Sequence, residues 1–204
     1  MRKSDLKYTS DIAFTPSVKN LQKKYKSRAN YARMEEFGGW ASEVTTDLEF
    51  FLSTIDSFYL ATANANGQPY IQHRGGPKGF LKVLDKTRLA FADFKGNKQF
   101  ITSGNLTDNN QAFIFLMDYP NQARIKLWGT AEVVYDDLEL IHSLHDSSYK
   151  AKPERAIVFT ITAWDVNCPQ HIKPRYTEED IQKQIYPLHE KIKELENQIK
   201  LLKR

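Results

Sequence analysis

Short strand-like segments separated by polar turns fill the middle of the chain and constrain its fold more than any other feature. Aromatic and β-branched residues recur in runs at 57–63, 69–74, 80–84, 88–92, 112–117, 123–135 and 155–163. The first two runs are joined by Asn64-Ala65-Asn66-Gly67, a polar stretch ending in Asn-Gly that is typical of a hairpin turn. Helical insertions are expected at 98–108 and 136–143, and both are short. The pattern therefore predicts an antiparallel β-barrel or sandwich rather than a parallel α/β sheet.

Two helical segments are expected before the first strand. Residues 15–36 have loosely helical spacing of apolar residues, which predicts a surface helix or arm that ends at Phe37-Gly38-Gly39. Residues 42–55 carry apolar side chains three and four positions apart, which predicts a second helix leading into the strands.

The C-terminal segment has the pattern of a coiled coil. A helix is expected from Thr177, because a hydroxyl N-cap is followed by three acidic residues. Ile and Leu then alternate spacings of four and three up to Leu202, with Ile at a and Leu at d. Pro187 predicts a kink or restart that leaves about two continuous heptads. Two partners remain open: a second copy, with Lys191 facing Glu196 of a parallel partner, or the chain's own barrel.

Composition places the chain among ordinary globular proteins. Its 204 residues are 41% hydrophobic and 26% charged, which predicts one domain with appendages. No apolar run reaches about 18 residues, and the N-terminus has no apolar stretch after its basic residues, so we expect neither a membrane span nor a signal peptide. A cytoplasmic protein is expected, in agreement with the single cysteine, Cys168. The formal charge of +4 suits an anionic ligand.

The stretch QHRGGPKGF at residues 72–80 combines polar side chains with glycines, and further cations follow it. Several cations converging on one pocket would suit a phosphate, while the glycines would let a ligand approach the backbone. The alternative is that these basic residues are scattered on solvent-facing strand edges. The candidates are Arg74, Lys78, Lys82, Lys98 and Arg124.

The succession RGGPKGF, FLKVLD, LAFADFKGNK, GNL and RIKLWGTAEVV resembles the pyridoxamine 5'-phosphate oxidase-like family of flavin-binding split barrels, over about residues 42–175. The resemblance implies a mainly β (α+β) fold: a six-stranded antiparallel split β-barrel with peripheral helices, to which this chain adds the C-terminal heptad helix. We expect an N-terminal helical arm at 1–41, an FMN-binding barrel at 42–175 and the C-terminal helix at 176–204. The resemblance also implies a homodimer with FMN at its interface; haem or a deazaflavin are alternatives.

The resemblance further implies site residues. Lys98 matches the lysine that reaches the flavin phosphate, and Asn97 stands where many members have arginine. Arg74 is the candidate for the missing guanidinium, in a loop with Gln72 and His73. The other expected cofactor contacts are Lys82, Phe91, Ala92, Arg124, Gln170 and Arg175.

Departures from the family limit what can be expected of its activity. The C-terminal Arg-Leu-His-Asp-Arg type of motif that grips the substrate phosphate is replaced by WDVNCPQHIKPRY, so oxidation of pyridoxamine 5'-phosphate is not expected. This terminus resembles a branch described as flavin-nucleotide-binding proteins. We expect an FMN-dependent oxidoreductase of unassigned substrate with a small-molecule or nicotinamide reductant; the alternative is a non-catalytic flavin carrier or redox sensor. No catalytic residue stands out, and neither nucleic-acid binding by residues 19–33 nor catalysis or metal binding by Cys168 and His171 is expected.

Overall fold

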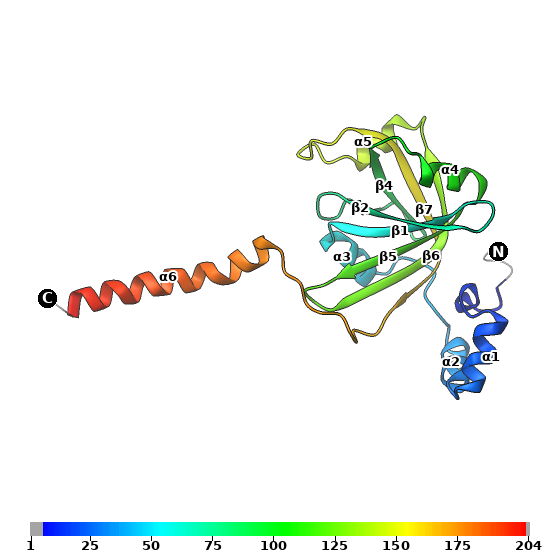
Figure 1. The fold of residues 1–204 in the computed structure, drawn as a ribbon, viewed down its shortest axis with the longest axis horizontal. Coiled ribbons are helices and arrows are strands. Elements are labelled where there is room, and N and C mark those ends of the chain that lie inside the picture. Colours follow the sequence, from blue (N-terminus) through cyan, green and yellow to red (C-terminus); the bar gives the residue numbers. More distant parts are fainter. Residues whose placement is uncertain (1–5, 203–204) are drawn as a thin grey trace. The chain divides into compact units, whose positions relative to one another are not determined.

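The computed structural model describes residues 6–202. These residues form two compact units (Figure 1): unit 1 comprises residues 6–117 and 124–168, and unit 2 comprises residues 118–123 and 169–202. The division into parts at 1–41, 42–175 and 176–204 stays a prediction.

One antiparallel sheet forms the body of unit 1. Its strands follow the order β2-β1-β5-β6-β7-β4-β3. The mainly β, α+β split barrel is thus confirmed, with a seventh strand, β3, that is two residues long. The strands are β1 Ser57–Ala63, β2 Pro69–Gly75, β3 Lys82–Val83, β4 Arg88–Phe94, β5 Gln111–Asp118, β6 Ala123–Val134 and β7 Pro153–Val166.

The burial pattern of the strands shows where the core lies. In β1, Phe58 and Leu60 are buried while Tyr59 between them is exposed, as expected for a strand with one face on the core. In β4, five consecutive residues are buried, because both of its faces are covered. Leu89 and Phe91 enter the main core. Ala90 and Ala92 instead pack with helix α5, Leu138–Leu144, where their small side chains leave room for it.

The N-terminal arm, residues 8–41, is helical but not one helix. Of the two alternatives expected for 15–36, a surface helix or an arm, a single helix is ruled out: α1 spans Pro16–Lys24 and α2 spans Arg28–Glu36, after a short 3-10 helix, η2, at Thr9–Ile12. The break follows from Lys26, whose φ of 61° is incompatible with a continuous helix. Trp40 at the end of the arm stacks on Trp128 of β6 with ring centroids 4.6 Å apart, which anchors the arm to the sheet.

The remaining helices start later than their sequence patterns suggest. Helix α3 spans Thr46–Thr54, because Thr45 caps it by accepting a hydrogen bond from the amide of Leu48 at 3.2 Å. Helix α4 spans Ile101–Asp108.

Helix α6 of unit 2 spans Glu178–Leu202 without interruption (Figure 1), so the expected restart at Pro187 is wrong. The other backbone hydrogen bonds of a 25-residue helix hold the segment together where one donor is missing. Among residues 6–202, no helix is both long and apolar enough to cross a membrane.

Candidate functional site

A small pocket in unit 1 gathers charged side chains from distant parts of the chain. Its walls come from β2, the end of β4, the loop that follows, the first turn of α4 and the start of β7, and its volume is about 100 Å³. We call it the Arg74 pocket; its lining residues are Tyr70, Gln72, Arg74, Asp93, Phe94, Gly96, Asn97, Lys98, Gln99, Phe100, Ile101, Thr102, Ser103 and Arg155.

Asp93 is the buried centre of the pocket's charge arrangement. Its side chain is 11% exposed and forms ion pairs with Arg74 through Oδ1 and with Arg155 through Oδ2, the latter at 2.9 Å. Strands β4 and β7 impose this arrangement, because Asp93 and Arg155 are cross-strand partners in their register. Glu154 adds a second carboxylate, 3.0 Å from Nη2 of Arg155. With Lys98 in the wall, three cations face two carboxylates, and the pocket has a surplus of one positive charge.

Both arginines keep unused hydrogen-bond capacity. The Nε atoms of Arg74 and Arg155 are buried and have no hydrogen-bond partner among the described residues. Although Nε of Arg155 lies close to Asp93, the pair does not have hydrogen-bond geometry. A buried donor without a partner is unfavourable by about 1–3 kcal/mol. An acceptor placed at such a donor would relieve that penalty.

The loop between β4 and α4 is held in an unusual backbone conformation. Lys98 and Phe100 both have positive φ, at 61° and 55°, a region that non-glycine residues rarely adopt. Asn97 supports the loop by accepting a hydrogen bond from the amide of Gln99 at 3.1 Å. Local strain of this kind is found at ligand-binding sites, where the rest of the structure holds it in place.

Helix α4 presents its N-terminus to the same pocket. Phe100 is its N-cap residue and supplies no side-chain cap. The amides of the first turn have no acceptor inside the helix, and residues 101–103 line the pocket. Thr102 fixes this turn against β2 by donating a hydrogen bond from Oγ1 to Oε1 of Gln72 at 2.7 Å. Helix N-termini attract anions through these amides and through the helix dipole.

Four of the residues expected from the sequence meet in this pocket: Gln72, Arg74, Asn97 and Lys98. Gln72 and Arg74 alternate with His73 along β2, and so share one face of the strand. The guanidinium of Arg74 also lies over the ring of Phe91, 5.6 Å from its centroid. Arg74 is therefore not a free cation, since it is already shared between Asp93 and an aromatic face.

The other expected residues of unit 1 lie outside the pocket. His73 is exposed on the opposite face of β2, near Tyr59 at 5.7 Å between ring centroids. Nζ of Lys82 donates to the carbonyl of Ser143 at 2.9 Å, which ties β3 to α5. Phe91 and Ala92 are buried in the two core clusters. Arg124 contacts the side-chain amide of Asn167, whose oxygen lies 2.9 Å from Nε when it is oriented as an acceptor.

Gln170 and Arg175 belong to unit 2. Gln170 is exposed, and the guanidinium of Arg175 lies 4.5 Å from the ring centroid of Tyr119. Their contact with a cofactor stays a prediction.

The glycines of the 72–80 stretch have a packing function in this structure. The amides of Gly76 and Gly79 donate to the carbonyls of Asp56 and Ile55, both at 2.9 Å. A Cβ on Gly76 would lie 2.7 Å from the ring of Phe80, and Gly79 has a φ of 75°. The turn therefore needs glycine to pack closely near the end of α3, and none of residues 75–80 lines the Arg74 pocket.

Asp93 and Arg155 were missed in the sequence, as was the contribution of the α4 N-terminus. A signal was present: each is a charged residue in an otherwise apolar strand, in LAFADF and RAIVFTITAW. Charged residues are almost never fully buried unless they are paired. One acid and one base in two core strands could have suggested that these strands pair.

Comparisons with known proteins agree with this architecture. HupZ of Group A Streptococcus is similar in two structures, with 16% and 17% sequence identity, TM-scores of 0.51 and 0.50, and coverage of 65% and 61% of this chain and 99% of HupZ. An FMN-binding protein from Syntrophomonas wolfei is 14% identical, with a TM-score of 0.46, over 74% of this chain and 97% of that protein. The similarity to HupZ supports the fold.

Sequence comparisons identify the family. No curated protein matches the chain. The family model described as pyridoxamine 5'-phosphate oxidase matches residues 44–168, which is more than half of the chain and includes every strand from β1 to β7. This chain therefore belongs to the pyridoxamine 5'-phosphate oxidase family.

Proposed function

We propose that this protein binds FMN non-covalently and that the Arg74 pocket holds the flavin phosphate. The observation that carries the proposal is the buried Nε donor of Arg74, which has no partner among the described residues, in a cationic pocket beside a helix N-terminus. A phosphate has about two negative charges near neutral pH and several acceptor oxygens, and an acceptor is what this donor lacks.

The size of the pocket fits the phosphate better than the whole cofactor. Sites that enclose a drug-sized ligand have roughly 300–1,000 Å³, whereas this pocket has about 100 Å³. The flavin ring would therefore lie outside it. FMN would supply electron or hydride transfer when bound, and the chain's residues would orient it.

Each group in the pocket has a distinct role in this proposal. Arg74 and Arg155 donate from their unused N–H groups while Asp93 keeps both guanidinium planes in position. Lys98 adds charge from the exposed loop. The α4 amides complete the donor set without adding a mobile charge.

A homodimer through the outer face of the sheet is part of the proposal. Outward residues of β1, β2 and β5 include apolar and aromatic side chains: Tyr59 lies opposite Phe115, and Ala61 lies opposite both Phe113 and Ile71. Phe113 contacts Trp128 at 5.1 Å between ring centroids. An apolar sheet face of this kind is typical of self-association surfaces. We propose that a second barrel covers it.

The dimer can be tested by light scattering of Ile71→Glu. Ile71 is 64% exposed on this face, and Leu138 on α5 is exposed to the same extent. Ile71→Glu should give a monomer, and Leu138→Glu should keep the wild-type mass. Equal masses for the two variants would reject this face as the interface.

We further propose that the bound flavin takes part in an oxidoreductase reaction with a nicotinamide or other small-molecule reductant. Stopped-flow reduction by NADH or NADPH tests this, because an enzyme should reduce bound FMN much faster than free FMN is reduced. A rate no greater than that of free FMN would instead indicate a flavin carrier or redox sensor that binds FMN in the same site.

The binding proposal is tested with FMN and riboflavin, since riboflavin lacks the phosphate. Arg74→Ala should raise the FMN dissociation constant roughly 10- to 100-fold, because each charge-assisted hydrogen bond is worth about 1.5–3 kcal/mol. Riboflavin binding should not change, and Arg88→Ala, an exposed arginine on β4 outside the pocket, is the control. Equal weakening of FMN and riboflavin binding would mean that Arg74 contacts the flavin ring or only supports the fold. If neither ligand binds more weakly, the Arg74 pocket is not the phosphate site.

A further inference from the structure

Helix α6 exposes a continuous apolar seam. None of its 25 residues is buried. Leu188 is 63% exposed, Ile192 51% and Leu195 45%. The complete seam consists of Ile181, Ile185, Leu188, Ile192, Leu195, Ile199 and Leu202.

The width of the seam distinguishes two kinds of partner. A helix that packs on a globular core presents a broad apolar stripe, at a, d and also e or g, whereas a coiled coil needs a and d alone. From Ile181 onwards the a positions of α6 are all Ile, and its d positions are Ile181 followed by three Leu. All flanking e and g positions within the helix are polar: Gln182, Gln184, His189, Lys191, Glu196 and Gln198. The narrow seam therefore indicates another helix of the same kind.

The residue types and charges favour a second copy in parallel orientation. Ile at a with Leu at d is the combination that favours parallel two-stranded coils. In that arrangement, Lys191 at g lies next to Glu196 at e of the partner, and the symmetry gives this pair of opposite charges twice. Pro187 occupies a c position, away from the seam.

The polar side of α6 can maintain the helix before it pairs. Ion pairs within the helix join Lys183 to Glu179 at 2.6 Å and Lys193 to Glu190 at 2.8 Å. Lys191 pairs with Glu194 at 2.7 Å in the single chain. Exposed pairs of this kind are weak, so Lys191 can exchange this partner for Glu196 of a second copy.

We propose that α6 forms a parallel, in-register two-stranded coiled coil with α6 of a second copy of this chain. This deepens the homodimer of the proposed function and does not depend on the flavin. The α6 seam would add a contact that is separate from the outer face of the barrel.

Cysteine cross-linking of the full-length protein tests the coil. In a parallel, in-register coil each seam residue meets its own copy across the axis, so Leu188→Cys and Leu195→Cys should both cross-link. Both variants are made with Cys168→Ser, which removes the exposed native thiol. Asn197→Cys, at an f position on the far side of the helix, is the matched control. After mild oxidation, the two seam variants should run mainly as covalent dimers, at least about fivefold above the control, as expected for thiols held in contact.

Other outcomes would overturn the proposal. Yields equal to that of Asn197→Cys would mean that the seam has another partner, such as the chain's own barrel. Cross-linking at one of the two positions only would indicate an antiparallel pair, in which at most one seam position meets itself.

Charge reversal provides a second, independent measurement. In the Leu195→Cys background, Lys191→Glu should lower the cross-linking rate roughly three- to tenfold, because attraction between g and e becomes repulsion at two symmetric places. Adding Glu196→Lys should restore it, and no effect of either change would reject the parallel register. The two proposals can fail separately: absent cross-links with an unchanged dimer mass would reject the coil alone, and unchanged cross-links with failed FMN binding would reject the flavin site alone.

Discussion

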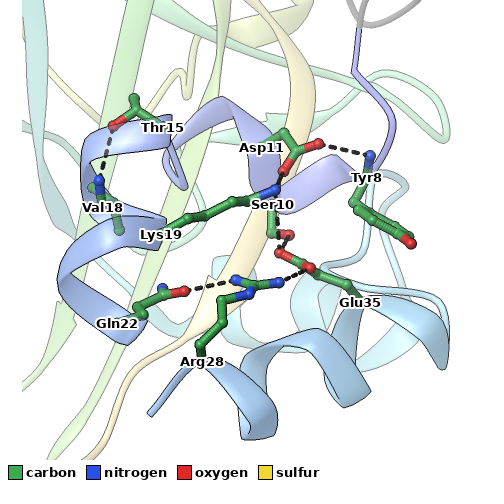
Figure 2. Close-up of polar contacts among 9 residues, drawn as sticks. All are labelled: Tyr8, Ser10, Asp11, Thr15, Val18, Lys19, Gln22, Arg28 and Glu35. Atoms are coloured by element: carbon green, nitrogen blue, oxygen red, sulfur yellow. Dashed lines mark hydrogen bonds and ion pairs between the residues drawn. The ribbon is translucent and has the colours of Figure 1, made fainter. Parts of the chain in front are cut away.

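Glu35 in the N-terminal arm and Asp93 in the barrel are both buried carboxylates held by two cations, but their surroundings differ. Glu35 pairs with Arg28, and Nζ of Lys19 lies 3.8 Å away (Figure 2). Ser10 donates to Glu35 at 3.4 Å, and Arg28 donates to Gln22 at 2.6 Å. Among residues 6–202, no side chain of this cluster has a buried polar atom without a partner.

In the Asp93 cluster, by contrast, a buried hydrogen-bond donor is left without a partner. Arg74 has a buried Nε without a partner, the Nε of Arg155 meets Asp93 without hydrogen-bond geometry, and both arginines line a cavity. A network in which no buried donor lacks a partner joins α1, α2 and η2 into one arm, whose contacts Figure 2 shows, and needs no ligand. A network with an unused donor beside a cavity can bind a ligand there. Buried charge is present in both networks and therefore does not distinguish a structural ion network from a candidate binding site. The distinguishing feature is whether every buried hydrogen-bond donor has a partner.

The largest expected effect is on the stability of the arm. Glu35→Ala should destabilise the arm by up to about 3–5 kcal/mol, because it removes a buried carboxylate and leaves the partly buried Arg28 without its ion-pair partner. Denaturant unfolding followed by tryptophan fluorescence, with Trp40 as the reporter in the arm, measures this. Glu36→Ala, an exposed neighbour on α2, is the control. FMN affinity should not change; a loss would show that the arm contributes to the site and that the comparison is wrong.

The second-largest expected effect is on the affinity for FMN rather than on the stability of the fold. Arg155→Lys keeps a positive charge beside Asp93 but removes the guanidinium donors, so FMN should bind about tenfold to a hundredfold more weakly. Riboflavin should bind as before. Isothermal titration with both ligands measures this, and Arg88→Lys on the same pair of strands is the control. Unchanged FMN affinity would mean that the Arg155 donors are not used.

A smaller effect is expected from the exposed cation of the pocket. Lys98→Gly removes the amine while glycine accepts the positive φ without strain, so the loop should keep its conformation. FMN affinity should fall about two- to fivefold, corresponding to the weak interactions of exposed charges. Gln99→Gly, in the same loop, is the matched control. A loss as large as that of Arg155→Lys would mean that exposed charge dominates binding.

The smallest effect concerns an exposed carboxylate with an arginine partner. Hydrogen bonds from the Thr87 amide and then from the Arg88 side chain lower the pKa of Asp85 from its ordinary 3.8 to about 2. The folded-state pKa is depressed, so this stabilisation is present above pH 3.8 and is lost as the pH falls towards 2. Thermal unfolding at pH 5 and pH 2 should show wild type more stable than Asp85→Asn at pH 5, with a much smaller difference at pH 2. A difference as large at pH 2 as at pH 5 would come from the turn geometry rather than the charge.

Local features of this fold were predictable. The Asn64–Gly67 turn, the strand β1 and the start of α6 all depend on residues within a few positions of one another. The break at Lys26 was missed, because the helical pattern continues on both sides and one residue with positive φ leaves no periodic signal. The 72–80 stretch was partly misinterpreted: its glycines suggested a ligand loop but serve close packing, whereas Arg74 does reach the pocket.

The sequence by itself determined the mainly β class, the family and the heptad seam of α6, because each depends on spacing along the chain. The tertiary structure decided the site. Arg74, Asp93 and Arg155 become neighbours because β4 pairs with β7 in one register and β2 brings Arg74 to the same end. Whether their donors are left without partners depends on which groups meet after folding, and hydrogen-bond satisfaction is a property of that three-dimensional arrangement rather than of any segment.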